Sequence, residues 1–529
     1  MLFTSYSFIA FLCLMFAAYF LTPKRWQWVT LLIGSYVFYA FAGIEYLAFI
    51  GFTTVSAYVI SILIKRNITC ENDYVSANRE TLTKEQRKEY RSKSKKRRFR
   101  ILVCGLVLNF GVLAVLKYTA FGVNNLNSII GIFGAQKLTI PDLILPMGIS
   151  FYTFQTMGYL IDVYRGKAEP ERNLAKMALF VSFFPQLVQG PISSFSQLGP
   201  QLVEPHKFNS KSFTFGLQRI LWGYFKKLVI ADRVLVAINT MLDSPESYKG
   251  VYVLLLILLY SVQIYADFTG GIDITIGIAE AMGIKLTENF DRPFSSKSTK
   301  EYWRRWHITM GSWFREYIFV PIAVTKPMLK LNKTVSVRFG RIVASKTVAY
   351  LATGVTWFLT GLWHGAGWNF IVWGMLNCLV IIVSETLEPT YDKFHKRFPR
   401  LTESKAYECF MSVRTFMLMG TIRSLDCYRN VGLTFSMWGS MFTFNGTGDL
   451  LGGGIFQLGL SPADFVIIAL GVLVVFVVSK TSATRSVRER LYERPILSSV
   501  LFGVLFIVTV TFGAYGVGYD ASQFIYNQF

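Results

Sequence analysis

Charged residues are scarce in this chain: only 16% of its 529 residues are Asp, Glu, Lys or Arg, while 52% are hydrophobic. Soluble domains carry nearer a quarter of charged residues, so an ordinary soluble domain is excluded. The strict apolar–polar alternation of a membrane β-barrel is also missing. Many apolar stretches approach or exceed the roughly 18 residues that cross a bilayer as a helix, and lipid forces spanning segments to be helical. The sequence therefore predicts an all-α, polytopic integral membrane protein.

Several motifs of soluble enzymes are absent as well. The six cysteines show no paired spacing, so neither a disulfide framework nor a zinc site is indicated. The chain has no serine nucleophile elbow, no phosphate-cradling glycine loop and no zinc-binding helix motif. We therefore expect no metal and no tightly bound cofactor.

The net charge of +22 invites a nucleic-acid interpretation, but the position of the charge argues against it. Ten lysines and arginines lie between Lys84 and Arg100, in a short segment flanked by apolar stretches. Such an excess holds a loop on the cytoplasmic side of a membrane, which predicts a basic cytoplasmic loop at residues 65–100 and no nucleic-acid partner. Attraction of anionic lipid or of a phosphate-bearing cytosolic donor is the alternative interpretation.

The order of apolar and basic segments predicts the topology. No basic residue precedes the first apolar stretch, residues 2–21, whereas Lys24 and Arg25 follow it. A signal peptide needs the opposite order, so we expect a retained anchor with an extracytoplasmic N-terminus. Five basic residues in Lys480–Arg494 predict a second cytoplasmic loop and an extracytoplasmic C-terminus. The expected location is the plasma or inner membrane, which the chain crosses many times.

We expect about 11–12 transmembrane helices plus re-entrant or interfacial helices, all in one membrane domain covering residues 1–529. Its parts are the N-terminal spans (1–140), a core (141–384) and the C-terminal spans (385–529). The apolar pattern of the core is broken by Pro146, Pro185 and Pro191. Broken helices at membrane depth are tolerated where the freed backbone is buried in protein or lines a cavity, so the core is the expected location of the functional site.

Tryptophan and histidine are concentrated in one part of this core. Seven of the eleven tryptophans fall within residues 303–373, and two of the four histidines, His307 and His364, lie among them. An interfacial belt attracts tryptophan but needs no histidine, and an ionisable group inside a membrane is by default a functional candidate. A structural histidine bonded to a carbonyl is the alternative. His206 and His395 lie in polar sequence and are expected to be loop histidines.

The segment around His364 has helical spacing. If residues 350–383 are helical, three- and four-residue spacing places a set of residues on one face. This set is Trp357, Thr360, Gly361, His364 and Trp368. Gly361 and Gly365 form a small-xxx-small pair that lets another helix approach closely, which predicts His364 at a tight helix junction.

Two such histidines suit the removal of a proton from a hydroxyl, because a neutral imidazole with a pKa near 6.5 accepts and releases protons at neutral pH. An alcohol that attacks an acyl thioester loses its proton as the bond forms. The developing oxyanion needs a donor, and a second histidine, an arginine or an indole N–H would serve. Arg304 and Arg305 either snorkel or hold donor phosphates or polymer carboxylates. Asp267 and Asp273, in an apolar span, also fit an ion-coupled transporter.

Five long blocks carry a family resemblance. They are "LPMGISFYTFQTMGYLIDVYRG", "FVSFFPQLVQGPI", "YSVQIYADFTGGIDITIGIAEAMGIKLTENFDRPF", "YWRRWHITMGSWFREYIFVPI" and "TGLWHGAGWNFIVWGMLN". In this order, over residues 145–377, the chain resembles the membrane-bound O-acyltransferase family, and within it the alginate O-acetyltransferase-like branch.

The resemblance implies a funnel of helices around a central tunnel, and transfer of an acetyl group from a cytosolic thioester donor, acetyl-coenzyme A, toward an extracytoplasmic polysaccharide. His364 matches the family's catalytic histidine, which we expect to be the general base. His307 matches the second active-site position, which is asparagine in other branches; it would polarise the acyl carbonyl or share the proton. Bacterial members often pass the acetyl group to a separate exported or periplasmic acetyltransferase, which is the expected partner.

Further candidates are expected on the substrate side of these histidines. Trp306 and Trp363 would wall the tunnel and keep water away from the thioester. The weaker candidates for substrate contacts are Arg304, Arg305, Asn289 and Asp267. Asn377 stands where the family often has another histidine.

Two rival functions remain open at this point. The first is D-alanyl transfer to teichoic acid from a phosphopantetheine carrier protein. The second, from a different class, is an ion-coupled transporter without acyl chemistry. Inverted repeats would favour the transporter, and the sequence shows none.

Overall fold

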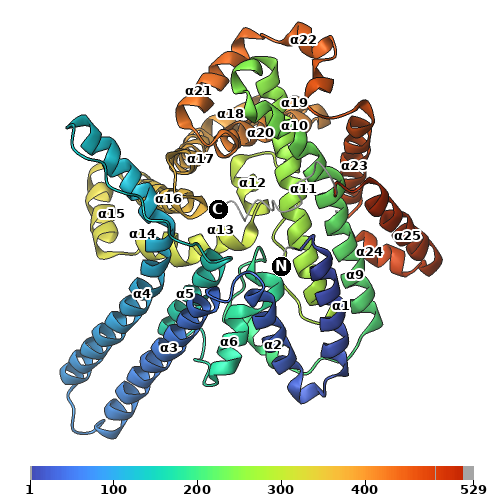
Figure 1. Cartoon of the computed structure of the whole chain (residues 1–529). Coiled ribbons are helices and arrows are strands. Elements are labelled where there is room, and N and C mark those ends of the chain that lie inside the picture. The colour runs from blue at the N-terminus through green and yellow to red at the C-terminus, as the bar shows by residue number, and fades with distance from the viewer. Residues whose placement is uncertain (1–2, 483, 516–529) are drawn as a thin grey trace. The chain divides into compact units, whose positions relative to one another are not determined.

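The computed structural model of the chain describes residues 3–482 and 484–515. Helices make up most of these residues, and no β-strand occurs among them (Figure 1). They form two compact units, which are described separately below. The first unit takes in residues 3–214 and 278–287, and the second takes in residues 215–277, 288–482 and 484–515. The predicted all-α fold class is confirmed.

Seven helices in the described part of the chain are long and apolar enough to cross a membrane. They are α3 (Tyr46–Ala77), α4 (Lys84–Ile132), α11 (Val251–Ala281), α16 (Arg341–His364), α17 (Trp368–Thr386), α23 (Pro462–Thr481) and α25 (Pro495–Phe512). Only 11% of the apolar window of α23 and 6% of that of α25 are buried inside the protein. Large apolar surfaces of this kind need a membrane or a partner to cover them. Other predicted spans are shorter: α1 (Tyr6–Leu21), for example, has 16 residues.

The first unit packs its short N-terminal helices around aromatic side chains. Phe8 and Phe11 of α1 meet Phe38 of α2 and Phe184 of α7, with ring centroids 5.9 Å apart for Phe8–Phe38 and 5.3 Å apart for Phe11–Phe184. Apolar helices that bury one stripe in this way form a stable unit. The remaining helices of the unit are α2 (Gln27–Ala40), α5 (Ile149–Arg165), α6 (Leu174–Ser182), α7 (Phe184–Leu187) and α8 (Phe195–Val203).

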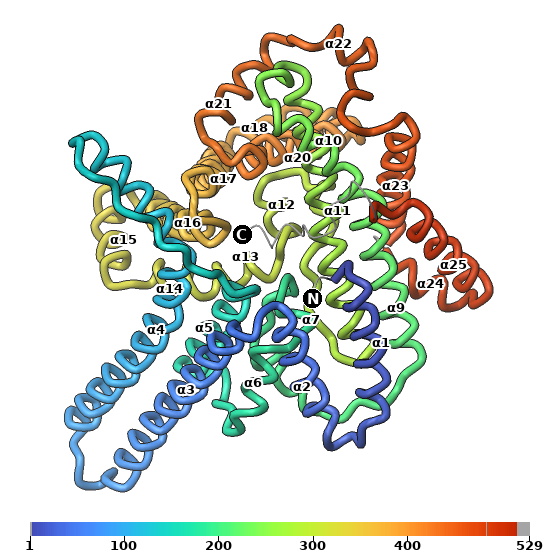
Figure 2. The backbone as a smooth tube through the Cα atoms, in the orientation of Figure 1, coloured from blue at the N-terminus to red at the C-terminus, as the bar shows by residue number. Residues whose placement is uncertain are grey.

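The basic segment at residues 65–100 consists of two helical stretches, 65–77 and 84–100, joined by a turn at residues 78–83. Helices α3 and α4 run side by side as a long hairpin, and Thr83 and Gln86 form a capping box at the start of α4 (Figure 2). Contacts across the hairpin hold it together: the rings of Tyr74 and Tyr90 stack at 4.2 Å, and Arg98 pairs with Glu71 at 2.7 Å. These cross-helix partners lie far apart in the sequence, so the count of charges alone does not predict them.

The broken helices predicted around Pro185 and Pro191 are present, and their backbone is buried in protein. Helix α6 ends at Ser182, and the short helix α7 starts at Phe184. Side chains replace the missing helical hydrogen bonds: the amide of Gln155 donates to the Phe180 carbonyl at 3.1 Å, and the hydroxyl of Ser35 accepts from the Phe184 backbone N–H at 3.1 Å. Buried backbone groups require such partners.

The second unit contains the C-terminal two thirds of α9 (Ser210–Tyr224) and the helices that follow it, apart from the end of α11. Helix α9 continues through a π-helix, η2 (Phe225–Ala231), into α10 (Asp232–Asp243). The elements that build the site are α11, α12 (Thr299–Arg305), α13 (Ile308–Phe314), α16, α17 and α20 (Lys405–Tyr428). Further helices of this unit include α15 (Lys326–Phe339), α18 (Glu388–Arg397), α21 (Val431–Ser440) and α24 (Val487–Tyr492).

Candidate active site

His307 lies at the junction of α12 and α13, and a backbone pairing fixes this junction. Phe290 and Trp306 form an antiparallel bridge, and the N–H of Asp291 donates to the Arg305 carbonyl at 2.9 Å. The N–H of Ile308 donates to the Asn289 carbonyl at 3.0 Å. His307 itself has φ +49°, a left-handed conformation that is costly for a residue with a side chain and that often occurs at functional sites.

The imidazole of His307 is almost fully buried, at 1% exposure. Its Nδ1 lies 3.2 Å from Oδ1 of Asn289, which is also buried. The ring contacts Phe268 of α11 at a centroid distance of 4.9 Å and Trp363 of α16 at 5.9 Å. Burial, together with the positive charge of Arg423, lowers the pKa of His307 to about 3, because both effects disfavour the imidazolium. The ring is therefore neutral at physiological pH.

His364 is the last residue of α16, where the chain reverses into α17. Its ring lies 5.0 Å from the ring of Trp363 and 4.6 Å from that of Trp373, both measured between centroids. His364 is 8% exposed. Trp363 therefore contacts both histidines, so the structure brings His307 and His364 to one indole.

The helix junction at His364 differs in part from the one-face prediction. Helix α16 ends at His364, so Trp368 begins the next helix and is 57% exposed. Gly361 does lie at a close helix contact, against the Phe370 carbonyl of α17. Gly365 lies beyond the helix end with extended backbone. The prediction of a shared face with Trp368 is wrong because two glycines, at 365 and 367, let the chain turn before that residue.

Arg423 is a member of this cluster that sequence reasoning missed. Its guanidinium lies 4.8 Å from the ring centroid of Trp306 and 5.5 Å from that of Trp373. A cation over buried indoles is stabilised by about 2 kcal/mol or more when desolvated. Trp303, the third ring near Arg423, donates its indole N–H to Asn377 at 3.2 Å. An arginine within the largely apolar residues 415–428 was the available signal.

The two predicted arginines do not join the histidines. Arg304 is exposed, and Arg305 pairs with Glu301 at 2.7 Å on the same helix. By contrast, Asn289, Trp306 and Trp363 all lie in the histidine cluster, as described above. The structure therefore places His307, His364, Trp306, Trp363 and Asn289 in one cluster. Arg304 and Arg305 lie outside this cluster.

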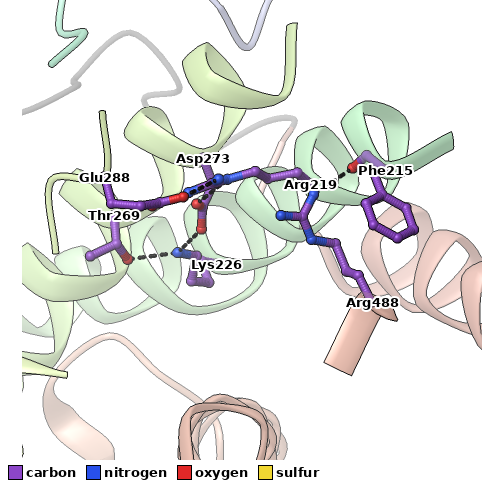
Figure 3. Close-up of polar contacts among 7 residues, drawn as sticks. All are labelled: Phe215, Arg219, Lys226, Thr269, Asp273, Glu288 and Arg488. Carbon is purple, nitrogen blue, oxygen red and sulfur yellow. Dashed lines mark hydrogen bonds and ion pairs between the residues drawn. The ribbon is translucent and has the colours of Figure 1, made fainter. Parts of the chain in front are cut away.

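The carboxylates of α11 are engaged in ion pairs. Asp267 is fully buried and lies 2.6 Å from Nζ of Lys227, which also contacts Asp232 at 2.7 Å. One turn and a half further on, Asp273 pairs with Arg219 at 2.8 Å and with Lys226 at 2.5 Å (Figure 3). Lysines 226 and 227 both come from the π-helix η2, so the wider turn presents two adjacent lysines to α11.

Arg219 connects this charge network to the loop that carries Asn289. Its two terminal nitrogens donate to the two carboxylate oxygens of Glu288 at 2.6 Å each (Figure 3). The network borders a pocket of about 550 Å³ that is also lined by Tyr265 and Phe290. Phe290 packs against Trp306 at a centroid distance of 5.1 Å, so the pocket adjoins the aromatic cluster.

Comparisons with known proteins extend these observations. The profile of the "MBOAT, membrane-bound O-acyltransferase family" matches residues 171–428. A probable alginate O-acetylase AlgI of Azotobacter vinelandii is 34% identical over 380 residues, which cover 71% of this chain and 66% of that relative, just under two thirds of its length. A peptidoglycan O-acetyltransferase of Helicobacter pylori is 30% identical over 407 residues, covering 72% and 68%. A teichoic acid D-alanyltransferase of Bacillus subtilis is 26% identical over 281 residues, covering 52% and 67%.

Proposed function

The chain belongs to the membrane-bound O-acyltransferase family, and from this premise we propose that it transfers an acetyl group from a cytosolic thioester donor toward a polysaccharide outside the membrane. The observation that carries the proposal is the meeting of two buried imidazoles, His307 and His364, at the ring of Trp363. Buried imidazoles in an aromatic setting that excludes water suit proton transfer during acyl transfer.

In the proposed reaction, a hydroxyl of the acceptor attacks the carbonyl carbon of the thioester. His364 takes the hydroxyl proton as the new C–O bond forms, and the electron pair of the carbonyl moves onto its oxygen. When this tetrahedral intermediate collapses, the C–S bond breaks and the thiolate leaves with the proton that His364 returns. A positioned base of this kind contributes roughly 10²–10⁴-fold to the rate.

His307 has two possible roles in this scheme. As a donor it would polarise the acyl carbonyl, and as an acceptor it would share the substrate proton with His364. The buried guanidinium of Arg423 and the indole N–H of Trp363 are further candidates for stabilising the oxyanion. The tryptophans around them exclude water, which would otherwise hydrolyse the thioester.

Acetyl-coenzyme A is the proposed donor, and a separate exported acetyltransferase is the proposed partner that completes the modification of the polymer. Support comes from the similarity to a probable alginate O-acetylase and to a peptidoglycan O-acetyltransferase, both of which are named for O-acetylation. We place the donor side in the cytoplasm, with both termini outside the plasma or inner membrane, because basic segments favour the cytoplasmic side.

A second candidate is D-alanyl transfer to teichoic acid from a phosphopantetheine carrier protein. It is favoured by the similarity to the Bacillus subtilis D-alanyltransferase, at the lower identity of 26%. Co-purification of a small acidic carrier protein with this chain would support it over acetyl transfer. The transporter hypothesis is weakened because Asp267 and Asp273 are ion-paired with lysines and an arginine.

The test is His364→Ala, with the exposed His395→Ala as its matched control. Cells that depend on each variant are compared for alkali-labile acetate on their extracytoplasmic polysaccharide and for the amount of protein in the membrane. We expect His364→Ala to abolish acetylation while accumulating normally, and His395→Ala to match the unmodified chain. Undiminished acetylation in His364→Ala would overturn the proposal.

A further inference from the structure

The side-chain amide of Asn289 has a defined orientation. Its Oδ1 lies 3.1 Å from the backbone nitrogen of Thr309 and 3.0 Å from the hydroxyl of Thr309. A backbone N–H can only donate, so the Asn289 atom that faces it is the oxygen. The hydrogen-bond network, rather than the shape of the amide, therefore settles which way Asn289 points.

This orientation determines the tautomer of His307. The same Oδ1 lies 3.2 Å from Nδ1 of His307. An amide oxygen accepts hydrogen bonds and cannot donate them, so Nδ1 must carry the proton. A neutral imidazole has one protonated nitrogen, which leaves Nε2 of His307 as a hydrogen-bond acceptor.

The surroundings of His307 hold the ring in this position. The backbone on both sides is tied down by the Phe290–Trp306 bridge and by the bond from the Ile308 N–H to the Asn289 carbonyl. The rings of Phe268 and Trp363 contact the imidazole at steep interplanar angles of 78° and 65°. A ring rotation that exchanged Nδ1 for a carbon would break the bond to Asn289.

We propose that Asn289 is a positioning residue that holds neutral His307 in the Nδ1-protonated tautomer, so that Nε2 accepts a hydrogen bond from a substrate hydroxyl. This inference rests on the acyl-transfer function proposed above and selects between the two roles given there to His307. A neutral ring in this tautomer has no proton on Nε2 to offer a carbonyl oxygen. Stabilisation of the oxyanion then falls to another donor, with Arg423 and the Trp363 indole as the candidates.

The tautomer is tested directly by ¹⁵N solid-state NMR of the full chain in lipid bilayers, with ¹⁵N-labelled histidine. The chain has four histidines, and His307→Asn identifies the signals of His307. At pH 7 we expect a protonated, pyrrole-type Nδ1 and an unprotonated, pyridine-type Nε2. In Asn289→Leu this preference should be lost. Asn109→Leu, which removes an equally buried asparagine from the first unit, should leave the signals unchanged.

Either of two NMR results would overturn the proposal: Nε2 carrying the proton in the unmodified chain, or His307 signals that Asn289→Leu does not alter. The first measurement needs no variant of Asn289, so a folding failure of Asn289→Leu cannot hide the answer. The measurement also needs no acyl transfer. Undiminished acetylation in His364→Ala would therefore remove the proposed function while the tautomer was still decided by the NMR.

An activity measurement asks whether the tautomer matters for catalysis. With acetyl-coenzyme A as donor, Asn289→Leu should lower the rate about tenfold, the equivalent of one hydrogen bond. Asn289→Asp keeps an oxygen opposite Nδ1 and places a negative charge there, so it should recover most of the rate and move the acid limb of the pH profile upward. A purely structural role for Asn289 would lower the amount of folded protein in both variants without moving that limb, and this outcome would contradict the proposal.

Discussion

Replacing Gly361 by alanine tests whether the contact between α16 and α17 sets the position of His364. An ideal Cβ at Gly361 would lie 2.5 Å from the Phe370 carbonyl oxygen and 3.2 Å from the Cα of Ile371, whereas ordinary contact begins at 3.4 Å. Both obstructing atoms belong to backbone, which cannot rotate aside. The two helices must therefore separate by roughly 0.9 Å at this point.

The catalytic consequence follows from what the two helices carry. His364 lies three residues after Gly361 on α16, and its ring partner Trp373 is on α17, with ring centroids 4.6 Å apart. A misplacement of 1 Å in a catalytic group can cost about 10²-fold in rate. We therefore expect Gly361→Ala to lower the acetylation rate by roughly tenfold to 100-fold. Helix propensity alone makes alanine favourable at this position, because it stabilises a helix by about 1 kcal/mol relative to glycine.

The assay compares Gly361→Ala with Gly354→Ala on the same helix. Gly354 has no neighbour within 4 Å of its ideal Cβ, so alanine fits there without displacing anything. Acetate on the polysaccharide and protein in the membrane are measured for both variants, and the rate is expressed per molecule of inserted protein. Equal rates for the two variants would refute the reasoning, since they would show that the helix separation does not position His364.

Three further predictions concern pH, stability and topology. His307→Asn should leave the acid limb of the pH–rate profile between about pH 5 and 8 unchanged, because the pKa of His307, lowered to about 3, keeps the ring neutral there; a moved limb would contradict this. Arg219→Met removes one of the two cations that contact the carboxylate of Asp273 and leaves Lys226 as the other, so a loss of about 1.5–3 kcal/mol, the contribution of a hydrogen bond to a charged group, should appear as reduced thermal stability in detergent. In a variant with Cys70 as its single cysteine, an impermeant maleimide should label the exposed thiol in inside-out vesicles and not in intact cells; the reverse pattern would place the basic hairpin outside.

The sequence predicted most reliably what depends on composition and local pattern. The all-α membrane fold follows from long apolar runs, and the broken segments followed from Pro185 and Pro191. The histidine cluster was predicted because only four histidines exist and two of them lie among tryptophans. These signals are local in the chain, so no knowledge of tertiary contacts was needed to read them.

What escaped prediction depends on residues that are distant in sequence. Arg423 lies more than a hundred residues after Trp306, yet its guanidinium lies over that ring. The pairing of the two helical stretches within residues 65–100 uses cross-hairpin contacts such as Arg98 with Glu71. The turn after His364 was not predicted because the helical spacing of residues in the sequence continues through Gly365. Only the extended backbone of that glycine in the structure shows where the helix ends.

The ion pairs and the residues around His307 share two structural elements, α11 and the segment that carries Asn289. Phe268, which packs on His307, stands on α11 directly after Asp267, whose carboxylate lies 2.6 Å from Lys227 of the π-helix. Glu288, which both terminal nitrogens of Arg219 contact, directly precedes Asn289. Buried ion pairs are a poor source of net stability, but they specify register because any slip leaves a charge uncompensated. The buried Lys227–Asp267 pair therefore specifies the register of α11, which carries Phe268, and the more exposed Arg219–Glu288 pair ties the segment that carries Asn289 to α9.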